Sequence, residues 1–278
     1  MTSDLIIQGP LANQSMAKTL SSQTGAGGIE QTGPIAFRIL HPQATDGVAA
    51  YCANAQIDFA LVPATRRLAD FRLVAMDMDS TLITIECIDE LADLVGRKAE
   101  VAAITAAAMR GEFDYPESLR QRVAALAGIE LTAVASVYAD RLRLSPGAEA
   151  MLAGLRALQL KTLLASGGFT YFTDRLKDRL GLDFAHSNTL DIAGGRLTGR
   201  LTGELVDGAG KARAVVDLAK RLGIQTEQII VIGDGANDLP MMAVAGVSIA
   251  YRAKPAVRAK ATYCFNYVGL DGLLALFR

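Results

Sequence analysis

The sequence predicts an α/β fold with a mostly parallel sheet covered by helices on both faces, a helical insert, and a small amino-terminal α+β domain. Short apolar segments alternate with helical segments from residue 161 onward, a pattern typical of parallel sheets. Residues 88–158 are helical in pattern throughout. Residues 1–70 differ from both parts in composition, so we expect one domain at 1–70 and a second at 71–278.

The elements predicted for the amino-terminal domain follow the order strand, helix, strand, strand, helix, strand. They lie at 5–7, 11–20, 28–32, 35–40, 47–55 and 57–62. This order is typical of the ferredoxin-like fold. Residues 13–33 are rich in Gln, Ser, Thr and Gly, which leaves open a partly disordered leader followed by a single βαβ fragment.

The first strand of the larger domain is predicted at 73–76, and a helical insert follows it directly. The helices of this block are predicted at 88–94, 99–110, 116–126, 131–140 and 146–158. Their alanine content and the apolar residues three and four apart support helices. Gly96, Gly111 and Gly128 suit the helix ends.

Strands and helices alternate after the insert. Strands are predicted at 161–165, 228–232, 247–250 and 263–265, with a hairpin at 190–201 around Gly194 and Gly195. Helices are predicted at 169–180, 210–222 and 239–245. Because the helices connect successive strands, we expect them on both faces of one sheet.

Composition excludes several classes of function. The 278 residues carry a net charge of −1, so we expect neither a nucleic acid nor a membrane as partner. No apolar run reaches the roughly 18 residues of a membrane helix, and the first residues lack the basic segment of a signal peptide. Three widely spaced cysteines provide no disulfide framework. We therefore expect a cytoplasmic protein.

Polar residues gather at four points where a predicted strand ends or a helix begins. They are Asp77 and Asp79 with Ser80 and Thr81; Ser166 with Gly167 and Gly168; Lys211; and the segment from Gly233 to Asp238. In an open parallel sheet these points share the edge where ligands bind. Carboxylates two residues apart on an extended chain point the same way, which suits metal binding or a nucleophile beside a general acid/base.

Each cluster also has a plain structural explanation. Asp77 and Asp79 suit a turn or a helix N-cap, and Ser166 to Gly168 suit a tight turn. Lys211 suits a solvated helix position. Because one topology would bring all four clusters to the same edge, we favour a functional site. With only two histidines in the chain, a metal there would be a hard, oxygen-bound cation such as Mg²⁺.

Together these clusters resemble the haloacid dehalogenase-like superfamily of phosphotransferases. Its four motifs are matched, in chain order, by Asp77-x-Asp79-x-Thr81, by Ser166, by Lys211 and by Gly233 to Asp238. Glu86, the run Ser118 to Arg122 and the segment Ser166 to Phe169 extend the resemblance to the phosphoserine-hydrolysing members. The resemblance covers about residues 70–278. Bacterial relatives often carry an amino-terminal extension, sometimes similar to the small-molecule-binding ACT domain.

The resemblance implies a Rossmann-like sheet with a helical cap inserted at about 86–145. Asp77 would be the nucleophile that forms an aspartyl-phosphate, and Asp79 the general acid/base. Mg²⁺ would be held by the Asp77 carboxylate, the Asp79 backbone carbonyl and Asp234. Phosphate would be bound by Ser166, the Gly167 N–H, Lys211 and Asn237, with Asp238 and Thr81 in support.

Glu86 and Arg122 decide the expected substrate. A zwitterionic amino acid needs an anion for its ammonium group and a forked cation for its carboxylate, which arginine supplies. Both residues also suit ordinary solvated helix positions. Met109, Phe113 and Tyr115 would give the cap an apolar surface, although such residues are more often part of a core.

The activity implied by the resemblance is hydrolysis of O-phospho-L-serine to L-serine and phosphate, the last step of L-serine biosynthesis. Two alternatives stay open. One is a related phosphatase or phosphotransferase that acts on another small phosphomonoester; the other is a non-catalytic ligand-binding regulator, against which the intact Asp77 and Asp79 argue. Residues 1–70 would bind a small ligand such as serine, and the oligomeric state stays open, a homodimer included.

Overall fold

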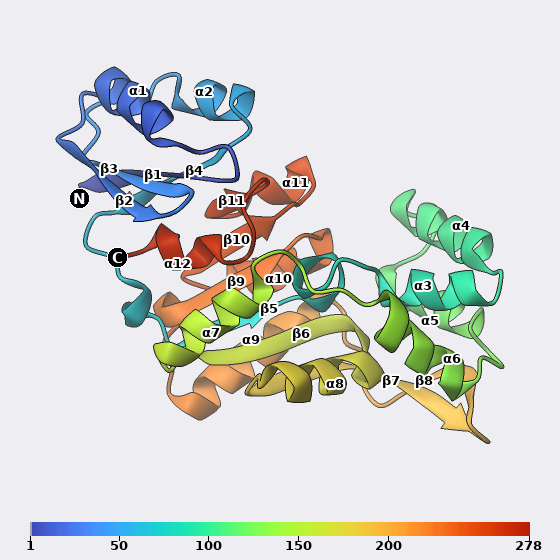
Figure 1. The fold of residues 1–278 in the computed structure, drawn as a ribbon. Helices are drawn as coiled ribbons and strands as arrows, with labels where there is room; N and C mark the ends of the chain where they lie inside the picture. Colours follow the sequence, from blue (N-terminus) through green and yellow to red (C-terminus); the bar gives the residue numbers. More distant parts are fainter. Residues whose placement is uncertain (1) are drawn as a thin grey trace.

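A computed structural model describes residues 2–278, apart from the side chain of Met109. Figure 1 shows a small sheet with two helices beside a larger α/β unit, from which a group of helices projects on the far side. The small sheet has four strands and the large sheet has seven. The predicted α/β fold is therefore confirmed. Among the described residues, no helix has the length and apolar character that crossing a membrane requires.

The small sheet is antiparallel, with strand order β2-β3-β1-β4. Its elements are β1 (Ser3–Gln8), α1 (Gln14–Thr24), β2 (Gly28–Gly33), β3 (Ala36–Leu40), α2 (Val48–Asn54) and β4 (Asp58–Pro63). This is the predicted order of elements, and the alternative of a disordered leader is not what forms. Helix α1 begins at Gln14 rather than at residue 11 because the Asn13 side chain caps it, accepting from the Met16 N–H at 3.1 Å.

The large sheet has the strand order β11-β10-β9-β5-β6-β7-β8, and all its pairs are parallel except β7 with β8. Its strands are β5 (Leu73–Met76), β6 (Lys161–Phe169), β7 (Phe184–Ala193), β8 (Arg196–Thr202), β9 (Ile229–Gly233), β10 (Val247–Tyr251) and β11 (Tyr263–Phe265). The mostly parallel sheet that the alternating pattern predicts is thus confirmed.

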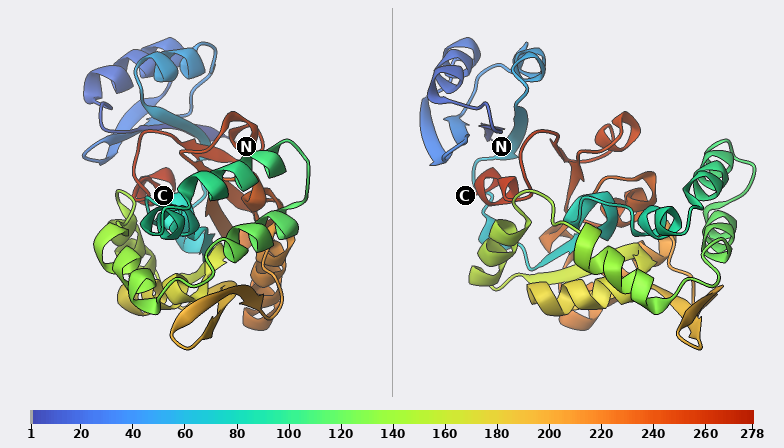
Figure 2. Two further views of the ribbon diagram at one scale, coloured as in Figure 1. Left: turned by 90° about the vertical axis from the view of Figure 1, so that its right-hand side faces the viewer. Right: turned by 45° about the vertical axis from the view of Figure 1, so that its right-hand side comes forward.

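Helices cover both faces of this sheet (Figure 2). One face shares a buried cluster with α7 (Ala148–Ala157), α8 (Thr170–Leu180) and α12 (Gly272–Leu276). The other face shares a cluster with α9 (Gly208–Leu222), α10 (Leu239–Ala243) and α11 (Pro255–Arg258). Along β5 the side chains alternate: Val74 and Met76 join the first cluster, and Leu73 and Ala75 join the second.

The helical insert follows β5, as predicted. It contains α3 (Cys87–Leu94), α4 (Lys98–Met109), α5 (Tyr115–Ala124), α6 (Leu131–Ser136) and the π-helical turn η3 (Val137–Arg141). The single helix expected at 131–140 is therefore divided in two. The β7–β8 hairpin braces this cap, because the Gly128 N–H donates to the Leu197 carbonyl at 2.8 Å.

Two strands differ from the prediction. Strand β6 continues through residues 166–168, beyond the predicted end at residue 165, and ends at Phe169. Strand β7 begins at Phe184, six residues before the predicted hairpin, and pairs with both β6 and β8. Its first half carries His186, Ser187 and Asn188. These polar residues hide the strand from an analysis based on apolar pattern.

The small sheet docks on the large unit through polar and apolar contacts. The buried Asp58 carboxylate, at the start of β4, accepts hydrogen bonds from the backbone N–H groups of Asn266, Tyr267 and Val268 at 2.8–2.9 Å. The face of the small sheet that does not pack against α1 and α2 adds Ile6 to the main core, together with Ala60 and Val62. The boundary predicted near residue 70 stays a prediction, although the connection includes a short 3-10 helix, η1 (Leu68–Asp70).

Candidate active site

The first motif leaves the end of β5 as extended backbone. Asp77 (φ −71°, ψ 160°) and Asp79 (φ −65°, ψ 136°) are both extended, and Ser80 has a left-handed φ of 55°. Met78, between them, belongs to the η2 turn (Met78–Leu82), so the two aspartates do not lie on one continuous extended strand. The Ser80 hydroxyl donates to Glu86 Oε1 at 2.7 Å. The turn therefore also fixes the Glu86 side chain at the start of the cap.

Lys211 lies in the first turn of α9 and is completely buried. Its ammonium nitrogen is 2.7 Å from Asp77 Oδ1 and 2.8 Å from Asp238 Oδ1. Burial lowers the pKa of Lys211, but the two carboxylates outweigh that effect and raise it. The lysine is therefore a fixed cation at the end of β5, which corrects the alternative of a solvated helix residue.

The fourth motif joins the same cluster. Asp238 is completely buried, and its Oδ2 accepts from the backbone N–H groups of Asp234 at 3.1 Å and Gly235 at 3.0 Å. Asp234 Oδ1 accepts from the Thr81 hydroxyl at 3.1 Å. Asn237 lies half-buried in the 3-10 turn η5 (Ala236–Asp238). The motif thus holds Asp238 against Lys211, and Asp234 against Thr81 of the first motif.

Three carboxylates of this cluster could hold a cation. Oxygen atoms of Asp77, Asp234 and Asp238 lie within 4.8 Å of one another. Burial raises the pKa of Asp77, repulsion from Asp238 adds to the rise, and Lys211 opposes it. Burial, followed by the same repulsion, raises the pKa of Asp234 to about 6. One lysine thus leaves excess negative charge, and the all-oxygen set suits a hard divalent cation.

Asp79 is the carboxyl group suited to proton transfer near neutral pH. Burial and then the nearby charge of Glu86 raise its pKa to about 7, while the Cys87 N–H, which donates to Asp79 Oδ1 at 3.0 Å, opposes the rise. An acid/base catalyst works best when its pKa lies close to the working pH. The environment therefore fits the predicted role, and the role itself stays a prediction.

The second motif lies against the first. Ser166 is completely buried, and its Oγ accepts from the Gly168 N–H at 2.9 Å. A Cβ atom at Gly168 would lie 2.7 Å from Met78 Cε and 2.8 Å from Asp79 Oδ2. Only glycine leaves room for this approach. The structure thus brings Ser166, Asp79, Lys211 and Asp234 to one edge of the sheet, as the sequence predicts.

Two residues of α5 extend from the cap toward this edge. The Tyr115 hydroxyl lies against the Gly167 backbone, leaving no room for a Cβ atom there. The Arg122 guanidinium carbon is 5.9 Å from the centre of the Tyr115 ring, and its Nε donates to the Ser118 carbonyl of its own helix at 3.4 Å. Burial raises the pKa of Glu86, and the charge of Arg122 counteracts this rise. Glu86 and Arg122 therefore interact electrostatically.

The other predicted cap residues contribute less. Phe113 lies half-buried in the turn before α5. The predicted contribution of Met109 concerns a side chain outside the described part of the chain. The sequence analysis placed Ser80 in the first cluster without its contact to Glu86, and it missed Cys87. The signal for Cys87 is weak because it acts through its backbone N–H, which any residue other than proline supplies.

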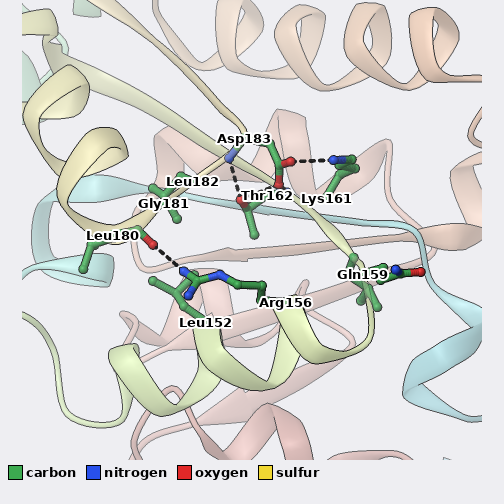
Figure 3. Close-up of a pocket in the computed structure, with 10 residues that line it drawn as sticks. Leu152, Arg156, Gln159, Lys161, Thr162, Leu180, Gly181, Leu182 and Asp183 are labelled. Atoms are coloured by element: carbon green, nitrogen blue, oxygen red, sulfur yellow. Dashed lines mark hydrogen bonds and ion pairs between the residues drawn. The ribbon is translucent and has the colours of Figure 1, made fainter.

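A cavity of about 520 Å³ lies elsewhere (Figure 3). Its lining includes Lys161, which pairs with Asp183 at 2.6 Å, and Arg156, which donates to the Leu180 carbonyl at 2.8 Å. Lys161 begins β6, whereas Ser166 lies near its carboxyl end, so the cavity is at the opposite edge of the sheet. The charged groups in its lining are paired with neighbours there, and it takes no part in the site described above.

Comparison with known proteins identifies the family. The family model for haloacid dehalogenase-like hydrolases matches residues 71–246. The chain belongs to this family. A phosphoserine phosphatase from Polaromonas is 54% identical over 217 residues, which are 76% of this chain and 92% of that protein. The resemblance noted in the sequence is thereby confirmed.

Solved structures of this hydrolase family extend the match to the amino-terminal sheet. A HAD family hydrolase from Salmonella enterica has a TM-score of 0.90 at 35% identity, covering 100% of this chain and 98% of its own. A probable phosphoserine phosphatase from Vibrio cholerae, in unliganded form, has a TM-score of 0.86 at 36% identity, covering 99% and 86%. Residues 1–70 thus have structural counterparts, although the sequence resemblance alone did not cover them.

Proposed function

We propose that the protein is a Mg²⁺-dependent phosphomonoesterase that hydrolyses O-phospho-L-serine to L-serine and phosphate, the last step of L-serine biosynthesis. The observation that carries the proposal is the buried contact of Asp77 with Lys211 at 2.7 Å, with Asp79 two residues further along the chain. A nucleophile, a proton carrier and a fixed cation are the parts that phosphoryl transfer through a covalent intermediate requires. The 54% identity to a phosphoserine phosphatase supports the choice of substrate.

The reaction would proceed in two displacements at phosphorus. An Asp77 carboxylate oxygen attacks phosphorus, the bond from phosphorus to the serine oxygen breaks, and Asp79 gives its proton to that oxygen. Asp79 then takes a proton from water, whose oxygen attacks the aspartyl-phosphate and releases phosphate with the Asp77 carboxylate restored. A pKa of about 7 for Asp79 allows both transfers near neutral pH.

The residues around Asp77 fit Mg²⁺. The Asp77 and Asp234 carboxylates and the Asp79 backbone carbonyl would hold the ion, with Asp238 kept close by. Bound there, Mg²⁺ would neutralise charge between the carboxylates and the phosphoryl group. Lys211, the Ser166 hydroxyl, the Gly167 N–H and Asn237 would bind the phosphoryl oxygens.

The cap would select an amino-acid substrate. Glu86, fixed by Ser80 at 2.7 Å, would receive the ammonium group of phosphoserine. Arg122, which forms no ion pair with any acid among residues 2–278, would bind its carboxylate through two parallel hydrogen bonds. With Tyr115 lying over Gly167, the closed cap would exclude bulk water from the phosphoryl group.

A phosphate-release assay with and without Mg²⁺ tests the proposal. We expect phosphoserine to be hydrolysed with a much higher kcat/KM than phosphoethanolamine or a sugar phosphate, because only phosphoserine offers both charges. Chelation of Mg²⁺ should stop turnover of every substrate. If phosphoserine were no better than the other phosphomonoesters, the roles of Glu86 and Arg122 would be wrong, and hydrolysis of another phosphomonoester would be the better description.

A small ligand such as serine at the amino-terminal sheet is a separate proposal, supported by its βαββαβ order of elements. Calorimetric titration of serine into the whole protein tests it in the presence of a saturating, non-hydrolysable phosphonate analogue of phosphoserine, which occupies both the phosphoryl and the amino-acid parts of the catalytic site. Heat from a second, saturable site would support this proposal, and no heat would refute it.

A further inference from the structure

Strand β6 is irregular where it supplies the second motif. Ala165 pairs with His186 and Phe169 pairs with Asn188, so residues 166–168 of β6 lie opposite Ser187 alone. Such a bulge removes the regular ladder of hydrogen bonds from the extra residues. Buried backbone groups rarely go without a partner. The Gly167 carbonyl therefore needs a hydrogen-bond donor from outside the ladder.

The Asn188 side chain supplies that donor and a second connection. It is 1% exposed, and its Nδ2 donates to the Gly167 carbonyl at 2.8 Å and to the Val206 carbonyl at 3.1 Å. Its Oδ1 accepts from the Val206 N–H at 2.8 Å. One buried amide thus joins the end of β6 to the segment that enters α9.

The first connection controls the Ser166 hydroxyl. A peptide unit is planar and trans, so the Gly167 carbonyl and the Gly168 N–H point in opposite directions along one rigid plane. Holding the carbonyl on Asn188 aims that N–H at Ser166 Oγ, 2.9 Å away. Because the serine oxygen accepts from the backbone, its proton is left to donate to a phosphoryl oxygen.

The second connection controls the lysine. Val206 directly precedes Asp207, whose Oδ1 caps α9 by accepting from the Gly210 N–H at 2.7 Å. Lys211 is the next residue of this turn and carries the ammonium group that contacts Asp77. A shift of Val206 would therefore move the start of α9 and the cation with it.

We propose that Asn188 is a positioning residue that sets the spacing between the two phosphate-binding groups of the site, the Ser166–Gly168 segment and Lys211. This inference rests on the proposed phosphatase function. Asn188 touches neither substrate nor metal in this role, and acts through Gly167 and Val206. The sequence prediction missed it because an asparagine within a strand has no recognisable spacing to the motifs; its rarity in strand interiors is the only signal.

The test uses two substitutions with different steric effects. Asn188→Asp keeps the size and the acceptor but places an oxygen against two carbonyls, and Asn188→Ala removes all three hydrogen bonds. We expect each to lower kcat/KM by about tenfold or more, since at least two hydrogen bonds to the site are lost. The loss should be equal for phosphoserine and p-nitrophenyl phosphate, because both share only the phosphoryl group. Binding of inorganic phosphate, measured by calorimetry with Mg²⁺, should weaken by a similar factor.

Thr162→Val is the matched control. Thr162 is a buried polar residue at the opposite end of β6, where its hydroxyl donates to Asp183 Oδ2 at 3.1 Å and accepts from the Asp183 N–H at 3.0 Å (Figure 3). We expect this variant to lose melting temperature but to keep wild-type kcat/KM and phosphate affinity.

The outcomes separate this inference from the proposed function. Asn188 variants that lose melting temperature yet bind inorganic phosphate as the wild type does would overturn the inference. If Asn188→Ala does not fold, Asn188→Asp, which preserves the volume, decides by the same measurement. A wild-type protein that binds phosphate and hydrolyses p-nitrophenyl phosphate but not phosphoserine would refute the substrate and leave this test in force.

Discussion

At the scale of single residues, the Asp77 carboxylate is tightly held by its neighbours. It is 5% exposed and lies 2.7 Å from the Lys211 ammonium group. In the role proposed for it, one of its oxygens would attack phosphorus while the lysine orients the other. A nucleophile at this position needs both negative charge and nucleophilicity. An amide of the same shape has neither.

Asp77→Asn should therefore abolish phosphate release. The amide keeps the shape of the side chain but is a poor nucleophile, so no phosphorylated enzyme should form. Acid quenching of a reaction with ³²P-labelled phosphoserine measures the trapped intermediate: label should be found on the wild-type protein and not on the variant. Label on the variant protein would place the nucleophile elsewhere.

Arg122→Ala should change the preference among substrates rather than the chemistry. The guanidinium group is expected to bind the substrate carboxylate, which p-nitrophenyl phosphate lacks. We expect KM for phosphoserine to rise about tenfold to a hundredfold, with little change for p-nitrophenyl phosphate. Arg120→Ala is the control, because Arg120 is exposed on the same helix and pairs only with Glu117 at 3.6 Å. Equal losses on both substrates would contradict the role of Arg122.

Asp79→Asn should stabilise the protein at alkaline pH while it removes activity. The pKa of Asp79 is raised from 3.8 to about 7 in the folded state, so folding favours the protonated acid. The contribution of Asp79 to the free energy of unfolding is then largest below its unfolded-state pKa, and it is lost as the pH rises toward 7. Without divalent cations, the variant should melt several degrees higher than the wild type at pH 8. The difference should vanish near pH 4; a difference that is independent of pH would contradict this explanation.

At the scale of elements, the β7–β8 hairpin supports the cap helix that carries Tyr115 and Arg122. Gly199 in β8 has a φ of +82°, and a Cβ atom there would lie 2.8 Å from Ala127 Cβ and 3.2 Å from the Ala124 carbonyl. The close approach of hairpin and α5 thus depends on a missing side chain. The contact fixes one side of the cap against the large sheet.

Gly199→Ala should separate the hairpin from α5. Gly203→Ala is a matched control, because its φ is +77° and nothing lies within 4 Å of a Cβ atom there. Both variants incur a left-handed backbone cost of roughly 1–2 kcal/mol, and Gly199→Ala should lose about 1–3 kcal/mol more through overpacking. Urea denaturation measures the difference. If the two variants lost the same free energy of unfolding, the contact between the hairpin and α5 would tolerate the added methyl group.

The sequence predicts most of the elements but not their junctions. Apolar runs such as 73–76 and 229–232 locate buried strands because burial on both faces demands continuous apolar residues. That rule fails for the first half of β7, where Asn188 is polar because it serves the bulge in β6. Site residues on strand ends could be predicted from topology. The contact of Tyr115 with Gly167 could not, since it depends on how the cap closes.

At the scale of the whole molecule, one carboxylate does much to join the two units. Asp58 is 3% exposed, and it accepts four hydrogen bonds from the segment Asn266 to Val268, including one from Asn266 Nδ2 at 3.1 Å. Burial raises the pKa of Asp58, and these hydrogen bonds oppose the rise. A buried acid without them would be strongly unfavourable.

Asp58→Asn should loosen the small sheet from the large unit. The amide brings an N–H donor against backbone donors, and hydrogen bonds to a charged acceptor are each worth roughly 1.5–3 kcal/mol. We expect proteolysis in the connection at 64–70 to become faster, with phosphatase activity kept, because the site lies within the large unit. Asp46→Asn, at an exposed position of the same unit, should leave the cleavage rate unchanged. An unaltered rate in Asp58→Asn would show that apolar contacts alone maintain the docking.

The spacing of this contact sets an order of events during synthesis on the ribosome. Asp58 and Asn266 are 208 residues apart in the chain. At roughly 5–20 residues per second, the small sheet waits on the order of 10–40 s for its partner segment. During that interval the face that carries Ile6, Ala60 and Val62 lacks the part of the main core that is translated last, including Val268 and Leu273. The nascent protein therefore presents an apolar sheet to chaperones until the last part of the chain is translated.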